Sequence, residues 1–238
     1  MKLRVMICAM AVSAALFADD VMSSTFGLMR VTDTASSNTV VGVPWKNIGD
    51  TGNVTLSNLV STATLAADDI VYLYEGTTWY AYQLNAAGIW APMTTVSGVT
   101  SGTPDAANVK TLARGTGLII QRANNADPIY LCGRYDSSSP GSTTVAAGAT
   151  ALIANPKTEA KIIANDFGSV GDQISVPKNG GALDTYERRA DGWYGTTIIK
   201  VGGRDVKKKS KLESGVEIAP GKGAWYINNG TADAVIAW

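Results

Sequence analysis

The sequence repeats part of itself. Residues 112–120 (LARGTGLII) match residues 218–226 (IAPGKGAWY), and the match runs on without a gap for a further eleven positions, to Leu131 and Ala237. Upstream, residues 82–90 match residues 186–194 at nearly the same spacing. Two matches at nearly the same spacing indicate an internal duplication. We therefore expect two homologous units whose repeated segments superpose.

Each copy of the repeat contains a Gly-x-Gly turn, an apolar run, a polar turn and a second apolar run. The glycines are Gly115 and Gly117 in the first copy and Gly221 and Gly223 in the second. The pattern predicts a terminal β-hairpin in each unit. Gly117 and Gly223 directly precede apolar runs, where a positive φ or a close backbone approach is expected. They are therefore predicted to be the less replaceable glycine of each pair.

Short apolar runs rich in Val and Thr alternate with turn residues along the rest of the chain, which holds 25 glycines. This composition favours strands over helices. Only residues 56–65 have a helical spacing of apolar residues, so one short helix is expected there. The predicted fold is all-β: two tandem homologous lobes from an internal duplication, each like a β-sandwich or barrel, with a strand-like N-terminal arm.

The first residues have the features of a secretory signal peptide. Lys2 and Arg4 precede an apolar run that ends before Ala18. Cleavage is expected after Ala18, and cleavage after Ala15 is the alternative. A stretch of Ser, Pro and Gly separates the two repeats. The predicted organisation is signal peptide 1–18, N-terminal arm 19–37, repeat unit 38–136, linker 137–146 and repeat unit 147–238.

The N-terminal arm belongs to neither repeat, and the second unit offers no apolar counterpart of it. A lone strand leaves its backbone groups on water while its ordering costs about 1–2 kcal/mol per residue, so this segment must pair. We expect it to add to a sheet edge of a neighbouring subunit. Its anchors would be the apolar residues Phe26, Leu28, Met29 and Val31.

Composition excludes several kinds of chemistry. The chain has no histidine, which removes histidine-based acid–base catalysis and the usual zinc and copper sites. Its acidic residues mostly sit beside turn residues, where Asp bonds its own backbone, so a catalytic carboxylate pair is disfavoured. The Gly-x-Gly turns lead into strand-like runs and not into helices, as a phosphate loop would require. We expect no enzymatic activity, no cofactor and no metal.

Charge and aromatic content point to surfaces. The 20 basic and 20 acidic residues give a formal net charge of +0, which disfavours nucleic-acid binding and lowers one barrier to self-association. The run 207–211 is basic and is expected to be a solvated loop. Six Trp and nine Tyr against three Phe favour positions with one wet edge, such as interfaces or sugar platforms. Trp90 and Trp193, one in each copy of the match between residues 82–90 and 186–194, are the candidate surface aromatics.

These features together predict a secreted structural subunit of an extracellular assembly, such as a filament, sheath or surface layer at the cell surface. Its partner would be further copies of itself, joined through strand edges and aromatic-rich surfaces. A cell-surface module that binds a carbohydrate or another polymer is the alternative. An outer-membrane β-barrel is the second alternative, because the chain ends on Trp238 after partial alternation. No membrane span is expected in the chain that follows the signal peptide.

Overall fold

The computed structural model of the chain is nearly all β, with several antiparallel sheets. Its only helical segment among the described residues is α2 (Leu56–Leu59), inside the range predicted from the sequence. The predicted signal peptide lies outside the described residues. The structure describes residues 26–31, 38–44, 53–75, 78–96, 99–100, 105–107, 110–123, 127–134, 141–177, 182–201 and 204–238.

The first half of the chain forms a five-stranded sheet and three small ladders. The sheet has the order β2-β10-β4-β5-β6, and the ladders are β1-β11, β3-β9 and β7-β8. Two apolar runs of the sequence, 70–74 and 79–84, are separated by a Gly-Thr turn signal and predict the hairpin β4–β5 of this sheet. The strands are β1 (Phe26–Val31), β2 (Asn38–Gly42), β3 (Val54–Thr55), β4 (Ile70–Glu75), β5 (Thr78–Leu84), β6 (Trp90–Met93), β7 (Thr95–Val96), β8 (Val99–Thr100), β9 (Thr111–Leu112), β10 (Gly117–Gln121) and β11 (Ile129–Arg134).

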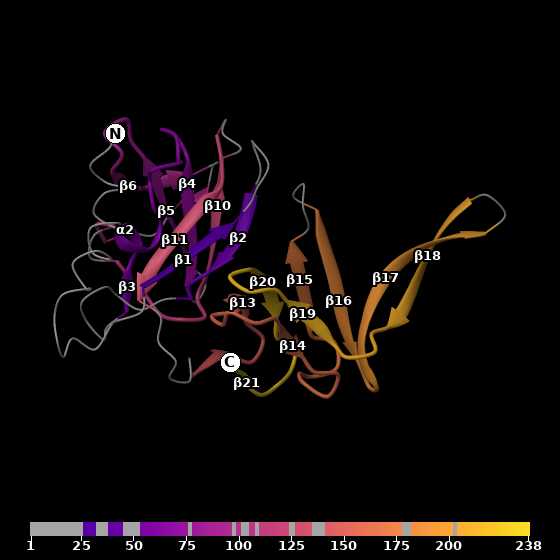
Figure 1. Ribbon diagram of the computed structural model, residues 1–238. Coiled ribbons are helices and arrows are strands. Elements are labelled where there is room, and N and C mark those ends of the chain that lie inside the picture. Colours follow the sequence, from indigo (N-terminus) through magenta and orange to yellow (C-terminus); the bar gives the residue numbers. More distant parts are fainter. Residues whose placement is uncertain are drawn as a thin grey trace, which may run out of the picture.

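The second half forms a six-stranded sheet and two small ladders (Figure 1). The sheet has the order β13-β20-β15-β16-β17-β18, and the ladders are β12-β21 and β14-β19. The strands are β12 (Ser142–Val145), β13 (Thr150–Ala154), β14 (Lys161–Ile163), β15 (Gln173–Pro177), β16 (Leu183–Arg189), β17 (Gly192–Val201), β18 (Arg204–Lys211), β19 (Val216–Ile218), β20 (Gly223–Ile227) and β21 (Ala234–Ala237).

The pairings of the two halves follow the same order. The sheet β2-β10-β4-β5-β6 corresponds to β13-β20-β15-β16-β17, and the ladders β1-β11 and β3-β9 correspond to β12-β21 and β14-β19. The registers agree as well: Ile119 lies opposite Tyr72, as Trp225 lies opposite Ser175. Each half also has its own buried apolar cluster, one within residues 41–131 and the other within residues 145–238.

The predicted terminal hairpins are wrong. β10 pairs with β2 and β4 while β11 pairs with β1, so the two apolar runs lie in different ladders, and β20 and β21 do the same. Both runs have buried residues, and each needs strand partners. The chain turns a corner between the two runs, so that each run pairs with different strands. The second corner is also one residue shorter. Ile129, Leu131 and Gly133 are the buried positions of β11, whereas Ala234 and Ile236 are those of β21, so the ungapped sequence match is one residue out of step there.

The predicted role of the N-terminal arm is also wrong in this chain. β1 pairs along its whole length with β11 of the same chain, from Phe26 opposite Arg134 to Val31 opposite Ile129. The counterpart that seemed absent is β12, which pairs with β21 although it consists of small and polar residues. Main-chain hydrogen bonds do not require apolar side chains, so its composition hid it. β12 also takes residues 142–145 out of the predicted linker.

The two halves meet at their Gly-x-Gly turns. The Gly42 N–H donates to the Gly221 carbonyl at 2.9 Å, and the Ala154 N–H donates to the Gly115 carbonyl at 3.0 Å. These bonds correspond to each other, because Gly42 ends β2 and Ala154 ends β13. Two isolated β-bridges cross the same boundary, Val41 with Lys222 and Thr116 with Ile153. Each turn therefore closes its own half and bonds the other.

The glycines of the turns divide two tasks. Gly115 and Gly221 have positive φ, +83° and +63°, and so form the tight turn itself. Gly117 and Gly223 allow the close approach of the halves. A Cβ on Gly117 would lie 2.6 Å from Leu152 Cγ, and one on Gly223 would lie 2.6 Å from Val40 Cγ1. Of the two reasons foreseen for these glycines, close approach is the one that applies.

Gly117→Val and Gly223→Val should each lower the free energy of unfolding by roughly 1–3 kcal/mol, because the added side chain forces the halves apart. Gly148→Asn is the control. Gly148 also has a positive φ (+70°) but has open space around it, and Asn tolerates that conformation. Urea unfolding monitored by circular dichroism measures the three changes. Midpoints that match the wild type in both valine variants would contradict this role of the turns.

Candidate functional site

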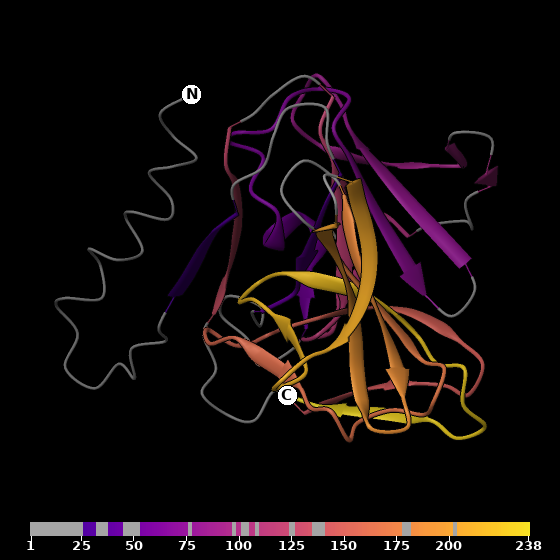
Figure 2. The ribbon, with the colours of Figure 1, turned by 90° about the vertical axis from the view of Figure 1, so that its right-hand side faces the viewer.

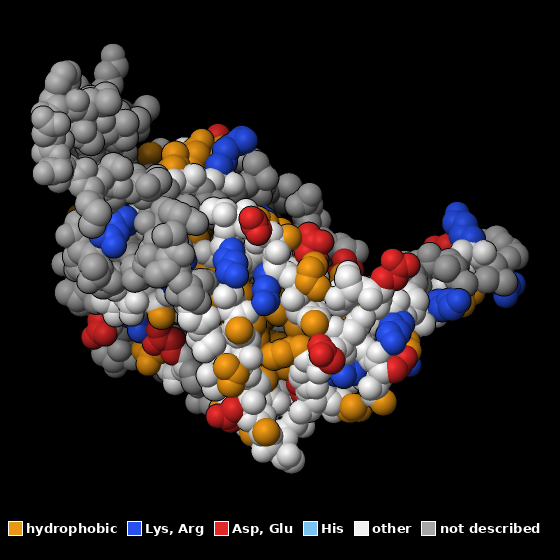
Figure 3. All heavy atoms as spheres, turned by 60° about the horizontal axis from the view of Figure 1, so that its bottom comes forward, with side chains coloured by type: hydrophobic (Ala, Val, Ile, Leu, Met, Phe, Trp, Pro, Cys, Tyr) orange, Lys and Arg blue, Asp and Glu red, His pale blue; other side chains and the backbone are white. Residues whose placement is uncertain are grey.

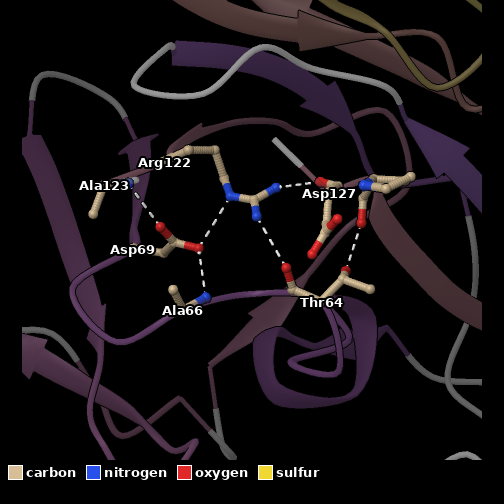
Figure 4. A network of polar contacts seen from close by, with 7 residues as sticks. Thr64, Ala66, Asp69, Arg122, Ala123 and Asp127 are labelled. Carbon is tan, nitrogen blue, oxygen red and sulfur yellow. Dashed lines mark hydrogen bonds and ion pairs between the residues drawn. The ribbon is translucent and has the colours of Figure 1, made fainter. Parts of the chain in front are cut away.

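The buried carboxylates of the chain serve its turns. Asp69 lies wholly buried before β4, where its Oδ2 accepts the Ala66 N–H at 3.0 Å and its Oδ1 accepts the Ala123 N–H at 2.7 Å. Arg122 Nε donates to the same Oδ2 at 3.0 Å (Figure 4). The remaining guanidinium nitrogens donate to the carbonyls of Asp127 and Thr64, at 2.6 and 2.9 Å. Every charged atom here has a partner inside the fold, which is typical of a structural ion pair.

Asp172 takes the same position in the second half with a different partner. Its Oδ2 accepts the Ser169 N–H and its Oδ1 the Asn229 N–H, both at 2.8 Å, which matches the bonds of Asp69. No Lys or Arg among the described residues forms an ion pair with this carboxylate, and the Tyr226 hydroxyl donates to Oδ2 at 2.5 Å instead. Burial, with this hydrogen bond, raises the pKa of Tyr226 well above its usual range. The expectation that turn aspartates bind their own backbone is confirmed at both positions.

The two carboxylates should differ in what they tolerate. Arg122→Met should cost about 3–5 kcal/mol of unfolding free energy, because it leaves a buried charge without its cation. Tyr226→Phe should cost about 1–3 kcal/mol, because Asp172 loses one hydrogen bond and keeps two backbone donors. Denaturant unfolding of both variants beside the wild type gives the comparison. An equal or reversed order would show that the Asp69–Arg122 pair is not held as a buried charge pair.

Trp90 and Trp193 are not surface aromatics. They occupy corresponding positions, opposite Leu84 and Arg188 in their ladders, but Trp90 is only 4% exposed and Trp193 is 0% exposed. The Trp193 indole N–H donates to the Ala164 carbonyl at 3.0 Å. Both rings belong to the cores. The prediction was wrong because strand alternation shows only that successive side chains point to opposite faces of the sheet. It does not show which face the core covers.

Four other aromatic rings gather where the halves meet. We call Tyr72, Tyr74, Trp79 and Trp225 the aromatic cluster. Trp225 of β20 lies 5.6 Å from Tyr74 and 5.5 Å from Trp79, while Trp79 lies 4.9 Å from Tyr74 and 6.2 Å from Tyr72, all as distances between ring centroids. All four are half-buried. The Tyr72 hydroxyl donates to Gln121 Oε1 at 2.5 Å, and burial raises the pKa of Tyr72.

The sequence indicates one member of this cluster, Trp79. The alternation of β5 places Trp79 on the face opposite Tyr80 and Tyr82, and Tyr82 is fully buried. That leaves Trp79 on the other face of the sheet. The sequence could not predict the contact with Trp225, which comes from the other half of the chain.

The hairpin β17–β18 projects from the body of the protein (Figure 1). Figure 2 looks from the side toward which it points. β16 accompanies β17 only from Gly192 to Tyr194, whereas β18 pairs with β17 onward to Val201. Beyond Gly195, the two strands therefore have only each other as ladder partners among the described residues. All side chains from Arg204 to Lys209 are exposed, so the expected solvated basic loop is in fact a strand.

Ion pairs hold the base of this hairpin. Lys209 bonds Glu187, and Lys211 Nζ lies 3.3 Å from an oxygen of Asp191. The hydrogen bond from Lys209 lowers the pKa of Glu187, and the hydrogen bond from the Tyr194 hydroxyl, at 3.0 Å, lowers the pKa of Asp191. Lowered carboxyl pKa values mean that these contacts are present at neutral pH and are lost as the pH falls through them. The basic residues nearer the tip of the hairpin include Arg204 and Lys207.

Within the described ranges, no group of three or more acidic or cysteine side chains is placed to hold a metal ion, and no helix is long and apolar enough to cross a membrane. Comparison with family models, with curated proteins and with solved structures found no match to this chain. The projecting hairpin and the half-buried aromatic cluster are the two features of the described residues that bear on function.

Proposed function

We propose that this chain is a secreted structural subunit of an extracellular assembly, such as a filament, sheath or surface layer, without enzymatic activity. The observation that carries the proposal is the projecting hairpin β17–β18. A two-stranded ribbon is marginally stable by itself in water. This one extends for several residue pairs beyond the sheet, and the outer edge of β18 lies at the end of the strand order. A contact with another copy would stabilise it.

The repeated pairing order supports the architecture behind this proposal. We infer that two tandem homologous lobes arose by duplication of one β unit, since strand orders, registers and turn hydrogen bonds correspond in both halves. The hairpin breaks that correspondence. β6 ends at Met93 with a short hairpin, β7–β8, after it, whereas β17 continues to Val201. The first half has only the two-residue strands β7 and β8 at this place among its described residues, so a hairpin as long as β17–β18 is not needed to complete the β unit.

Shortening the hairpin tests the proposal. Residues 197–208 are replaced by Asn-Gly, which joins the ladder partners Thr196 and Lys209 through a two-residue turn. The variant should keep the thermal midpoint of the wild type, because the described side chains of the removed ribbon, Lys200 and those from Arg204 to Lys208, are exposed. It should no longer form polymers in negative-stain micrographs or sediment as a large species.

Two results would contradict the proposal. One is polymers of normal length from the shortened variant, which would place the contact elsewhere. The other is a wild-type protein that stays monomeric at all accessible concentrations and in the presence of its native cell surface. A lowered thermal midpoint would instead show that the ribbon belongs to the fold of its own lobe.

The aromatic cluster favours a second candidate function, the binding of a cell-surface carbohydrate. Half-buried Trp and Tyr rings present flat apolar faces with polar edges, which suits sugar rings. Tyr74, Trp79 and Trp225 lie within van der Waals reach of one another across the boundary of the halves. Their close packing also serves that boundary, and for this reason the carbohydrate function stands second.

Glycan binding at the aromatic cluster should quench tryptophan fluorescence. Titration with cell-wall polysaccharides should give a saturable change that Trp79→Ala and Trp225→Ala each reduce by at least tenfold in affinity, about 1.4 kcal/mol. Trp193→Phe, a change of a buried indole, is the control and should leave the affinity unchanged. The absence of a saturable response over a broad glycan panel would remove this candidate.

A further inference from the structure

The second half has an apolar groove beside β21. It lies between β14 and β21, has a volume of about 330 Å³ and is lined by Ile162, Phe167, Val235 and Ala237 together with Lys161 and Asp166. Val235 is 53% exposed and Ile162 is 37% exposed. Figure 3 looks onto the side of the molecule that carries these strands, and apolar side chains gather around a hollow near its centre. β21 pairs only with β12, and β14 only with β19, in the ladders of the described residues.

In the first half, the corresponding place is filled by the chain itself. After β3, the chain forms α2 and then runs beside β11: Val60 makes an antiparallel bridge with Leu131, and the Ser61 N–H donates to the Tyr130 carbonyl at 2.9 Å. Leu56, Leu59 and Val60 are all buried there. The groove is therefore a place where an extended segment can add to the free edge of the terminal strand.

A shorter connection leaves the second half open. Leu56 corresponds to Ile163 by the ladder registers, and Ala66 corresponds to Ser169 by their bonds to the turn aspartates. In the first half, Leu56 and Ala66 are joined by the nine residues 57–65. In the second half, Ile163 and Ser169 are joined by only the five residues 164–168. The connection of the second half is thus too short to form a segment like the one that runs beside β11, and among the described residues the edge of β21 has no counterpart of Val60 and Ser61.

We propose that this groove receives the hairpin β17–β18 of a second copy, with β18 adding along the free edge of β21. The inference rests on the proposed assembly function and names its contact surfaces. β18 is the last strand of its sheet, so among the described residues its outer edge has no ladder partner and can offer main-chain hydrogen bonds, and its Val206, 42% exposed, supplies an apolar side chain for the groove. The added strand would take the place that Val60 and Ser61 take in the first half.

Charge favours a second copy as the occupant. Residues 192–211 contain six basic residues (Lys200, Arg204, Lys207, Lys208, Lys209 and Lys211) and one acidic residue, Asp205, for a net charge of +5. Since the whole chain has a formal charge of +0, the remainder carries −5. Asp166 lines the groove, and the exposed Glu217 lies opposite Ile162 in the β14–β19 ladder, on the same face. The hairpin is attracted to the body of any other copy.

This contact is head-to-tail. The hairpin and the groove are different surfaces of one chain, and the hairpin points away from the body while the groove lies on the side seen in Figure 3. A subunit that donates its hairpin still has its own groove to fill. Contacts of this kind propagate into a filament unless the rotation closes them into a ring.

Exchange of charges tests the contact with the full chain. One variant carries Lys207→Glu and Lys208→Glu on the hairpin, and the other carries Asp166→Lys and Glu217→Lys at the groove. Each alone should raise the critical concentration for assembly about tenfold or more, because attraction at two pairs becomes repulsion. An equimolar mixture of the two should assemble again as an alternating polymer, since each hairpin then meets a groove of opposite charge. Light scattering and negative-stain microscopy follow both.

The controls separate this inference from the proposed function. The single variants Asp105→Lys and Asp166→Lys change the net charge by the same amount, and Asp105 is an exposed residue of the first half. Asp105→Lys therefore controls for net charge and should leave assembly unchanged. Thermal midpoints equal to that of the wild type show that the variants fold. If the wild type assembles and the groove variants assemble equally well, or if the mixture stays unassembled, the groove contact is wrong while the assembly function stands. A wild type that never assembles removes both.

Discussion

The structure depends on the close approach of two backbones at the boundary of its halves. The bonds from Gly42 N–H to the Gly221 carbonyl and from Ala154 N–H to the Gly115 carbonyl tie each turn to the other half. That approach is possible only because Gly117 and Gly223 have no side chain. The strands that follow these glycines, β10 and β20, pair with β4 and β15 in the two sheets. Trp225 of β20 contacts Tyr74 and Trp79 across the boundary.

Each half has one buried aspartate among its described residues, and the two halves stabilise its charge with different side chains. A buried aspartate ties the segment before β4 or β15 to the corner after β10 or β20, through two backbone N–H groups. In the first half, Arg122 compensates the charge, and its other nitrogens hold the corner. In the second half, Tyr226 bonds the carboxylate, while Asn228, at the position of Arg122, donates to the carbonyls of Val145, Ala146 and Ala232. The backbone geometry is kept, and the side chains differ.

Two further features that differ between the halves lie at the surface of the second half. The connection after β14 is shorter than the one after β3, which opens the groove beside β21, and β17 is longer than β6, which creates the projecting hairpin. A free strand edge and an unsupported ribbon are both costs for a monomer. Both the groove and the projecting hairpin belong to the second half, and in the assembly that we propose the hairpin of one copy fills the groove of the next.

The sequence by itself determined the all-β class, the repeated segments, the hairpin β4–β5, the short helix and the role of the turn aspartates, because these depend on local composition and spacing. It could not determine which strands become neighbours. β10 and β11 read as a hairpin because they adjoin in sequence, but the chain turns a corner between them, and β12 escaped notice because ladder hydrogen bonds leave no trace in side-chain composition. Trp90 and Trp193 entered the cores because the tertiary fold decides which face of a strand is covered. The aromatic cluster and the groove exist only between segments distant in sequence, so only the tertiary structure could show them.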